Sequence, residues 1–307
     1  MMQVEGTEVD GIQAANCAPG GTAAHLAPPL SFAGLVLDRP HIMGVVNVTP
    51  DSFSDGGDAY PPSMAIARGL ALHAAGAAIV DVGGESTRPG AEPVPVEEEL
   101  ARVIPVVKGL ARSGVVVSVD TRRAAVMSAA TQAGAAIVND ISALAGDADA
   151  MRVLAQSEAS VVLMHMQGDP RTMQLAPRYD DVVHDVCGWL RERIAACEAA
   201  GIARDRLAVD PGIGFGKTLE HNLDILAHLD AFVELGRPVI VGVSRKSFIG
   251  RLSRNEAPKQ RVAGSLAAGL FALLQGVHIL RVHDVAETRQ ALAVWQAMAD
   301  KGEMASR

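Results

Sequence analysis

The stretch that decides the fold is AAIVDVGGESTRPGAE, residues 77–92. Its first half is a run of small and β-branched apolar residues around Asp81, which predicts a strand buried on both faces, as in a parallel sheet. The strand breaks into two glycines and the polar string 85–88, followed by a Pro-Gly pair. Hydroxyls and a guanidinium directly after a buried strand are typical of a ligand site in an α/β protein, although in isolation an ordinary turn would look the same.

The same pattern recurs along the chain, where small residues close a helix and lead into an apolar strand at 74–82, 133–140 and 275–283. Alternating strand–helix units imply parallel strands, and eight of them predict an α/β fold, the closed (β/α)8 TIM barrel. An open doubly wound sheet is the alternative, but the GxGxxG motif that its first turn needs is not found in residues 49–57. The expected strands are 42–48, 77–82, 115–120, 135–140, 160–165, 207–210, 238–244 and 277–283, and the expected helices are 62–75, 96–112, 122–133, 149–157, 182–200, 219–229, 261–275 and 285–301.

The composition favours one large barrel domain at 31–307 and an N-terminal extension at 1–30. Of the 307 residues 49% are hydrophobic but only 3% aromatic, so the core must consist mainly of small and aliphatic side chains. The extension is rich in Gly, Ala, Pro and Thr, and we expect it to be disordered. Residues 30–37 alternate loosely and are expected to close the bottom of the barrel as a short strand or hairpin.

Charge and hydropathy narrow the classes of partner. The formal net charge of -8 argues against nucleic acid or an anionic membrane surface. No apolar run approaches membrane-spanning length, and the N-terminus lacks the basic and apolar regions of a signal peptide. Cys17, Cys187 and Cys197 form no CxxC pair, which predicts free thiols in a reducing cytoplasm.

Polar residues stand at the end of every expected strand, where a barrel places its active site. One such residue alone would more often cap a helix, but eight strand ends with polar groups together predict a site. Carboxylates and amides on the third, fourth and sixth strands suit a flat heterocycle with N–H donors, whereas the cations on the last two strands suit a phosphate. The residues are Asn47, Asp81 with Glu85, Asp120, Asn139 with Asp140, His165, Asp210, Ser244 with Lys246, and Arg281 with His283.

Other familiar site motifs do not occur in the sequence. There is no HExxH or paired-histidine spacing for zinc, and residues 214–218 lack the spacing of a Walker loop. Ser244 follows a GxS pattern, but Lys246 stands where a serine-hydrolase elbow needs glycine. For Arg281, an ion pair with Asp284 or with a strand-end carboxylate stays open as an alternative to a phosphate site.

Six motifs, within residues 37–295, resemble the dihydropteroate synthase family of bacterial folate biosynthesis. In chain order they are NVTPDSFSDGG, GAAIVDVGGESTRPG, SVDT, DPGIGFGK, SRKSFIG and RVHD. The resemblance implies a barrel transferase that joins 6-hydroxymethyl-7,8-dihydropterin diphosphate to p-aminobenzoate and releases 7,8-dihydropteroate and diphosphate. It also implies Mg²⁺ as cofactor, a cytoplasmic location and a homodimer that binds neither nucleic acid nor membranes.

The resemblance further implies roles for single residues. Lys246, Arg281 and His283 are the expected catalytic residues, and one amide oxygen suffices for Mg²⁺ because the ion keeps waters and binds diphosphate oxygens. The pterin contacts fall on Asp120, Asn139, Asp210 and Lys246, the anion site on Arg281, His283 and Thr87, the magnesium contact on Asn47, and the p-aminobenzoate pocket on Phe53, Arg88, Pro89, Phe215 and Ser244.

Three other functions are weighed against this one. A pterin-dependent methyltransferase uses the same barrel but has no use for a diphosphate site, so Arg281 and His283 count against it. An aldolase would use Lys246 to form a Schiff base with a carbonyl substrate. A non-enzymatic pterin-binding protein need not keep Thr87, Arg88 and Arg281.

Overall fold

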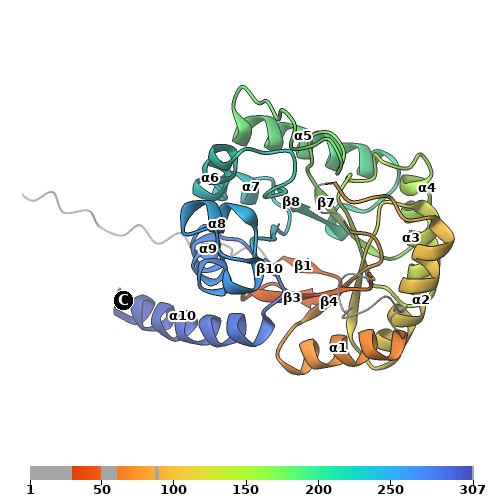
Figure 1. Cartoon of the computed structure of the whole chain (residues 1–307), viewed down its shortest axis with the longest axis horizontal. Helices are drawn as coiled ribbons and strands as arrows, with labels where there is room; N and C mark the ends of the chain where they lie inside the picture. Colours follow the sequence, from red (N-terminus) through yellow and green to blue (C-terminus); the bar gives the residue numbers. More distant parts are fainter. Residues whose placement is uncertain (1–29, 50–60, 87–89, 306–307) are drawn as a thin grey trace, which may run out of the picture.

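The computed structural model describes residues 30–49, 61–86 and 90–305, which form a barrel of strands surrounded by helices (Figure 1). The strands of the barrel are all parallel, and their sheet has the order β8-β7-β6-β5-β4-β3-β10-β9. Its two edges meet, because Val209 in β8 bridges in parallel to Val239, just before β9. The predicted (β/α)8 barrel is confirmed and the doubly wound alternative is wrong. The strands are β3 His41–Asn47, β4 Ile79–Gly83, β5 Val116–Asp120, β6 Ile137–Asp140, β7 Ser160–Met164, β8 Leu207–Asp210, β9 Ile240–Val241 and β10 Ile279–Val282.

The helices cover the outside of the barrel, and those expected from the sequence occur with ends shifted by a few residues (Figure 1). Two features were not predicted: the helix after β8 is divided in two, and a short helix, α8, follows β9. The helices are α1 Pro62–Ala74, α2 Val96–Arg112, α3 Ala124–Gln132, α4 Ala150–Ala155, α5 Val182–Ala199, α6 Leu219–Ala227, α7 Asp230–Val233, α8 Ser247–Leu252, α9 Val262–Leu274 and α10 Val285–Ala305.

Several strands begin about two residues later than predicted, and the hydrogen bonds of the preceding turn explain the difference. The N–H of Ala77 donates to the carbonyl of Leu72 at 3.0 Å, and the N–H of Gly76 donates to His73 at 2.9 Å. These bonds end α1, with Gly76 in the left-handed region at φ 109°. Ala77 therefore belongs to the helix cap, and β4 starts at Ile79.

A two-stranded hairpin closes the amino end of the barrel, as predicted. It consists of β1 Ser31–Phe32 and β2 Leu35–Val36, which pair antiparallel. Phe32 is buried and packs with the inward-facing residues at the bottom of the strands. The expected disorder of residues 1–30 concerns a segment that, except for its last residue, lies outside the described part of the chain.

The strand register places the polar residues at the other end of the barrel. The bottom layer inside the barrel is apolar and includes Ile79, Ile137, Ala208 and Ile279. Because side chains alternate across a strand, the residue two positions later faces the same interior, one layer nearer the carboxyl end. These second-layer residues are Asp81, Asn139, Asp210 and Arg281.

Hydropathy of the helices gives one further result. Among the residues that the structure describes, none of the helices combines the length and the apolar character needed to cross a bilayer.

Candidate functional site

The centre of the site is a buried ion-pair network around Arg281 in β10. Its Nε donates to Oδ2 of Asp81 at 2.7 Å, and its Nη2 donates to Oδ2 of Asp120 at 2.7 Å. Nδ2 of Asn139 also donates to Oδ2 of Asp81, at 3.2 Å. Asp81 is fully buried, whereas the Arg281 side chain keeps 23% exposure. The network therefore fixes the guanidinium between two strand-end carboxylates while leaving part of it open to a ligand.

The charges of this network depend on each other. Burial lowers the pKa of Arg281, but Asp81 and Asp120 outweigh that effect and raise the pKa above its ordinary value. Burial raises the pKa of Asp120 to about 7, and the neighbouring Arg281 opposes this shift. Asp81 has a second oxygen, Oδ1, that is buried and without a hydrogen-bond partner among the described residues. Two carboxylates thus share one guanidinium in this buried network.

Asp210 ends β8 and is fixed by its own turn. Its Oδ1 accepts a hydrogen bond of 2.7 Å from the N–H of Gly212, and its side chain is buried. Burial raises the pKa of Asp210, while the Gly212 N–H and the cations Lys246 and Arg281 oppose the rise. Gly212 has φ 70°, and a Cβ there would lie 1.9 Å from the carbonyl oxygen of His165. Only glycine fits this turn, so the backbone itself aims the carboxylate.

Lys217, which was not among the expected site residues, stabilises the same turn by hydrogen bonds. Nζ of Lys217 donates to the carbonyls of Gly212 and Phe215, both at 3.1 Å, and lies 3.0 Å from Nδ1 of His165. Burial lowers the pKa of Lys217 to about 7, and burial with the lysine beside it lowers the pKa of His165 to about 3. His165 therefore supports this turn, and its ring also packs edge-on against Trp189. The DPGIGFGK motif contained this lysine, but its burial cannot be read from the sequence.

The cationic side of the site comes from the ends of β9 and β10. Nζ of Lys246 donates to the carbonyl of Ile213 and lies 4.3 Å from the ring centroid of Phe215. Burial lowers the pKa of Lys246 to about 8, although Asp210 attracts its charge. Oγ of Ser244 accepts from the N–H of His283 at 3.2 Å and lies 3.1 Å from its Nδ1. Lys246, Phe215, Ser244 and His283 are thus joined in pairs at one end of the barrel.

Two strand-end carboxylates that we had noted support the fold instead. Asp140 accepts hydrogen bonds from the N–H groups of Ser142 and Leu144, at 2.7 and 2.9 Å, and so shapes the loop after β6. Glu85 pairs with Arg122 at 2.6 Å. Asp81, one of the strand-end residues predicted to gather at the site, is the buried partner of Arg281.

Asn47 lies beside Asp120 at the end of β3. Its Oδ1 and the Oδ2 of Asp120 are both 3.8 Å from the position that a Cβ on Gly83 would take. The missing side chain of Gly83 leaves room between these oxygens. Of the expected site residues, Phe53, Thr87, Arg88 and Pro89 lie outside the described part of the chain.

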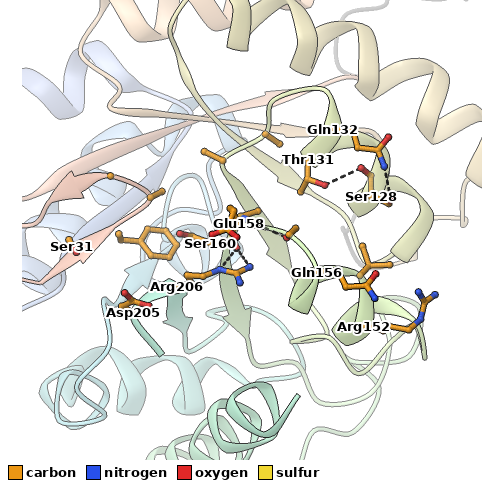
Figure 2. Close-up of a pocket in the computed structure, with 18 residues that line it drawn as sticks. Ser31, Ser128, Thr131, Gln132, Arg152, Gln156, Glu158, Ser160, Asp205 and Arg206 are labelled. Carbon is orange, nitrogen blue, oxygen red and sulfur yellow. Dashed lines mark hydrogen bonds between the residues drawn. The ribbon is translucent and has the colours of Figure 1, made fainter. Parts of the chain in front are cut away.

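A large hollow in the described structure is at the opposite end of the barrel. It measures about 900 Å³ and lies between the β1–β2 hairpin and the neighbouring helices, α3 and α4 (Figure 2). Its most buried cation, Arg206, is already bonded to the carbonyls of Ala159 and Leu154, each at 2.9 Å from one of its nitrogens. Among the described residues, this end has no network of convergent carboxylates and cations like that around Arg281, so we assign the chemistry to the carboxyl end.

The fold and the network define a barrel enzyme with a strand-end site, and comparison with known proteins specifies its class. The family model described as "Pterin binding enzyme" matches residues 43–283. A relative named dihydropteroate synthase, from Escherichia coli K12, is 52% identical over 264 residues, which is 86% of this chain and 93% of the relative.

Two solved structures from Xanthomonas albilineans, both of dihydropteroate synthase, are also similar. One contains 4-aminobenzoic acid; it is 54% identical, has a TM-score of 0.83 and is matched over 89% of this chain and 98% of that one. The other is in complex with 7,8-dihydropteroate; it is 51% identical, has a TM-score of 0.78 and is matched over 86% of this chain and 95% of that one. The chain belongs to the dihydropteroate synthase family, whose members are transferases.

Proposed function

We propose that the chain condenses 6-hydroxymethyl-7,8-dihydropterin diphosphate with p-aminobenzoate to give 7,8-dihydropteroate and diphosphate. The observation that carries the proposal is the convergence of Asp120, Asn139 and Asp210 with Lys246 and Arg281 at the carboxyl end, where Arg281 is held by Asp120 and still keeps 23% of its side chain exposed. Membership of the synthase family supports this function. It favours the synthase over a pterin-dependent methyltransferase, a Lys246 aldolase or a non-enzymatic pterin carrier.

The pterin would bind by its amino-pyrimidinone edge. Asp210 would accept two N–H bonds from this edge, because a carboxylate matches a guanidine-like group with parallel donors. Asn139 and Asp120 would bond the remaining ring nitrogens, and Lys246 would donate to a ring acceptor. The ammonium of Lys246 is already oriented by the carbonyl of Ile213 and the ring of Phe215.

The reaction needs no protein nucleophile. The C–O bond between the pterin CH₂ and diphosphate breaks, and the electron-rich ring delocalises the cation that remains. Arg281 and His283 would stabilise the departing diphosphate. The neutral amine of p-aminobenzoate then forms the C–N bond and loses one proton.

The p-aminobenzoate would lie against Phe215, with its carboxylate near Ser244. Phe53, Thr87, Arg88 and Pro89 are proposed to complete this pocket and the diphosphate site.

Asn47 fits the proposed magnesium contact. Its amide oxygen is a hard oxygen donor beside the gap left by Gly83, whereas Oδ2 of Asp120 at the same gap already accepts from Arg281. No group of three or more His, Cys, Asp and Glu side chains able to hold a metal occurs within the described ranges, so diphosphate oxygens and waters would supply the other ligands. When bound, Mg²⁺ would neutralise charge on the leaving diphosphate.

A diphosphate-release assay tests the function. We expect release that requires both substrates and Mg²⁺, with 7,8-dihydropteroate formed in equal amount. Release without p-aminobenzoate would indicate a hydrolase, and methyl transfer to a corrinoid in place of release would indicate the methyltransferase.

We also propose that the protein is a homodimer. Four large apolar side chains on α9 and α10 are at least half exposed: Phe271 at 50%, Leu274 at 70%, Val294 at 59% and Met298 at 67%. A second copy of the chain would cover this apolar surface, which is unusual on a monomer.

The dimer should be sensitive to a charge on α9. We expect Leu274→Glu to be monomeric by light scattering under conditions where the parent protein has twice the mass. Leu175→Glu is the matched control, since Leu175 is 81% exposed in the segment before α5. A parent protein with the mass of one chain would refute the proposal.

A further inference from the structure

Arg245 has an unusual backbone conformation between two residues of the proposed site. It lies between Ser244 and Lys246, and its φ is 60°. A non-glycine residue in the left-handed region is strained, and such strain persists only where surrounding contacts enforce it. The contacts of Arg245 therefore fix the positions of the adjacent residues, Ser244 and Lys246.

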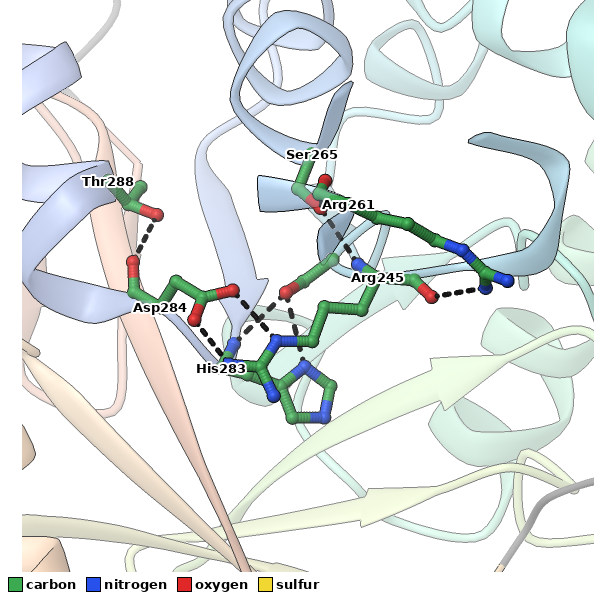
Figure 3. A network of polar contacts seen from close by, with 7 residues as sticks. Arg245, Arg261, Ser265, His283, Asp284 and Thr288 are labelled. Atoms are coloured by element: carbon green, nitrogen blue, oxygen red, sulfur yellow. Dashed lines mark hydrogen bonds and ion pairs between the residues drawn. The ribbon is translucent and has the colours of Figure 1, made fainter. Parts of the chain in front are cut away.

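Three contacts hold Arg245, and they come from different elements (Figure 3). Its N–H donates to Oγ of Ser265 in α9 at 2.8 Å, and its carbonyl accepts from Nη1 of Arg261 at 3.1 Å. Its side chain makes a bidentate ion pair with Asp284, in which Nε donates to Oδ2 at 2.9 Å and Nη2 donates to Oδ1. The ion pair is largely covered, because the two side chains are 24% and 10% exposed.

The ion pair runs parallel to a contact inside the site. Asp284 follows His283 directly, just as Arg245 follows Ser244, and Oγ of Ser244 bonds to the N–H of His283. Two adjacent residues after β9 are thus cross-linked twice to two adjacent residues after β10 (Figure 3). Moving either strand end would break both the Arg245–Asp284 ion pair and the hydrogen bond between Ser244 and His283. The ion pair therefore restrains the positions of Ser244 and His283.

We propose that the Arg245–Asp284 ion pair is a positioning clamp that sets Ser244 and His283 for the anionic groups of the substrates. This inference rests on the proposed function. Both arginine and aspartate act through their neighbours and are not catalytic residues. Bidentate geometry matters here because a planar fork fixes direction as well as distance, which a lysine cannot do.

The clamp is tested with inorganic diphosphate as the binding probe and with steady-state kinetics. We expect Arg245→Gln and Asp284→Asn each to weaken diphosphate binding and to raise KM for p-aminobenzoate by about tenfold, a typical loss for a misplaced contact. Arg245→Lys should fall between the parent and Arg245→Gln. Binding of 6-hydroxymethylpterin, which lacks diphosphate, should stay within about twofold and shows that each variant is folded.

The double variant separates a clamp from two independent effects. If both residues act through their pair, Arg245→Gln with Asp284→Asn should be no worse than either single change, within about twofold. Arg152→Gln with Asp149→Asn is the control, because this ion pair is equally direct at 2.8 Å but exposed on both sides. The control should change neither constant.

Several results would overturn the clamp. Additive losses in the double variant, or unchanged diphosphate affinity in both single variants, would show that the ion pair positions nothing. Tighter diphosphate binding by Asp284→Asn would show that Arg245 is itself a ligand once released. Diphosphate binding does not depend on turnover, so a parent protein without condensation activity would refute the proposed function and leave the clamp testable.

Discussion

Arg281→Ala should lower kcat by about 10²-fold or more, the usual loss when one preorganised electrostatic contact is removed. The contacts of Arg281 explain why the effect is expected in the transition state. Asp81 and Asp120 hold its guanidinium at 2.7 Å before any substrate binds, so no reorganisation is needed as charge grows on the departing diphosphate. His283→Ala should cost less, because Arg281 remains.

The same substitution should also destabilise the fold. Removing one partner of a buried ion pair leaves an uncompensated charge and costs about 3–5 kcal/mol. Here that charge is on Asp81, which is fully buried. We therefore expect Asp81→Asn to recover part of the lost melting temperature of Arg281→Ala without restoring kcat.

Single-turnover kinetics and thermal unfolding of the same preparations check both effects. Arg206→Ala is the matched control. Arg206 is also an arginine held by hydrogen bonds, but its acceptors are backbone carbonyls at the opposite end of the barrel. It should lower the melting temperature and leave kcat unchanged. An Arg281→Ala enzyme with normal kcat and only a raised KM would make Arg281 an anchor for the substrate and not part of the catalytic apparatus.

Asp210→Ala should abolish tight pterin binding and leave the barrel folded. Each charge-assisted hydrogen bond to a buried ring is worth about 1.5–3 kcal/mol, so losing two should weaken binding by roughly 100-fold or more. Asp210→Asn separates two roles, because it keeps an acceptor for the N–H of Gly212 but lacks the charge. We expect it to keep the turn and still bind pterin poorly.

Calorimetry with 6-hydroxymethylpterin measures this loss directly. Asp147→Ala is a suitable control, because Asp147 also accepts from a backbone N–H, that of Ala124 at 2.9 Å at the start of α3, but is not one of the proposed pterin contacts. Near-normal affinity in Asp210→Ala would rule out Asp210 as the residue that binds the ring edge.

The sequence by itself determined the architecture and the composition of the site. Apolar runs that end in polar residues, repeated eight times, specify parallel strands whose carboxyl ends meet, and this pattern depends only on neighbours along the chain. Because Asp81 and Asp210 follow apolar runs, the sequence already placed them at strand ends, where a barrel has its site. The assignment of Lys246, after β9, and of Arg281, in β10, to an anion site stays a prediction.

Only the tertiary structure decided how these groups pair. Arg281 and Asp81 are 200 positions apart and meet because the barrel closes, so the sequence left open whether Arg281 pairs with Asp284 or with a strand-end carboxylate. In the structure it pairs with the strand-end carboxylates Asp81 and Asp120, while Asp284 is taken by Arg245. The burial of Lys217 likewise depends on a glycine turn pressed against the carbonyl of His165. Local patterns fix the periodicity of each strand, but the partner of a charged side chain is the nearest opposite charge in three dimensions, and closure of the sheet selects it.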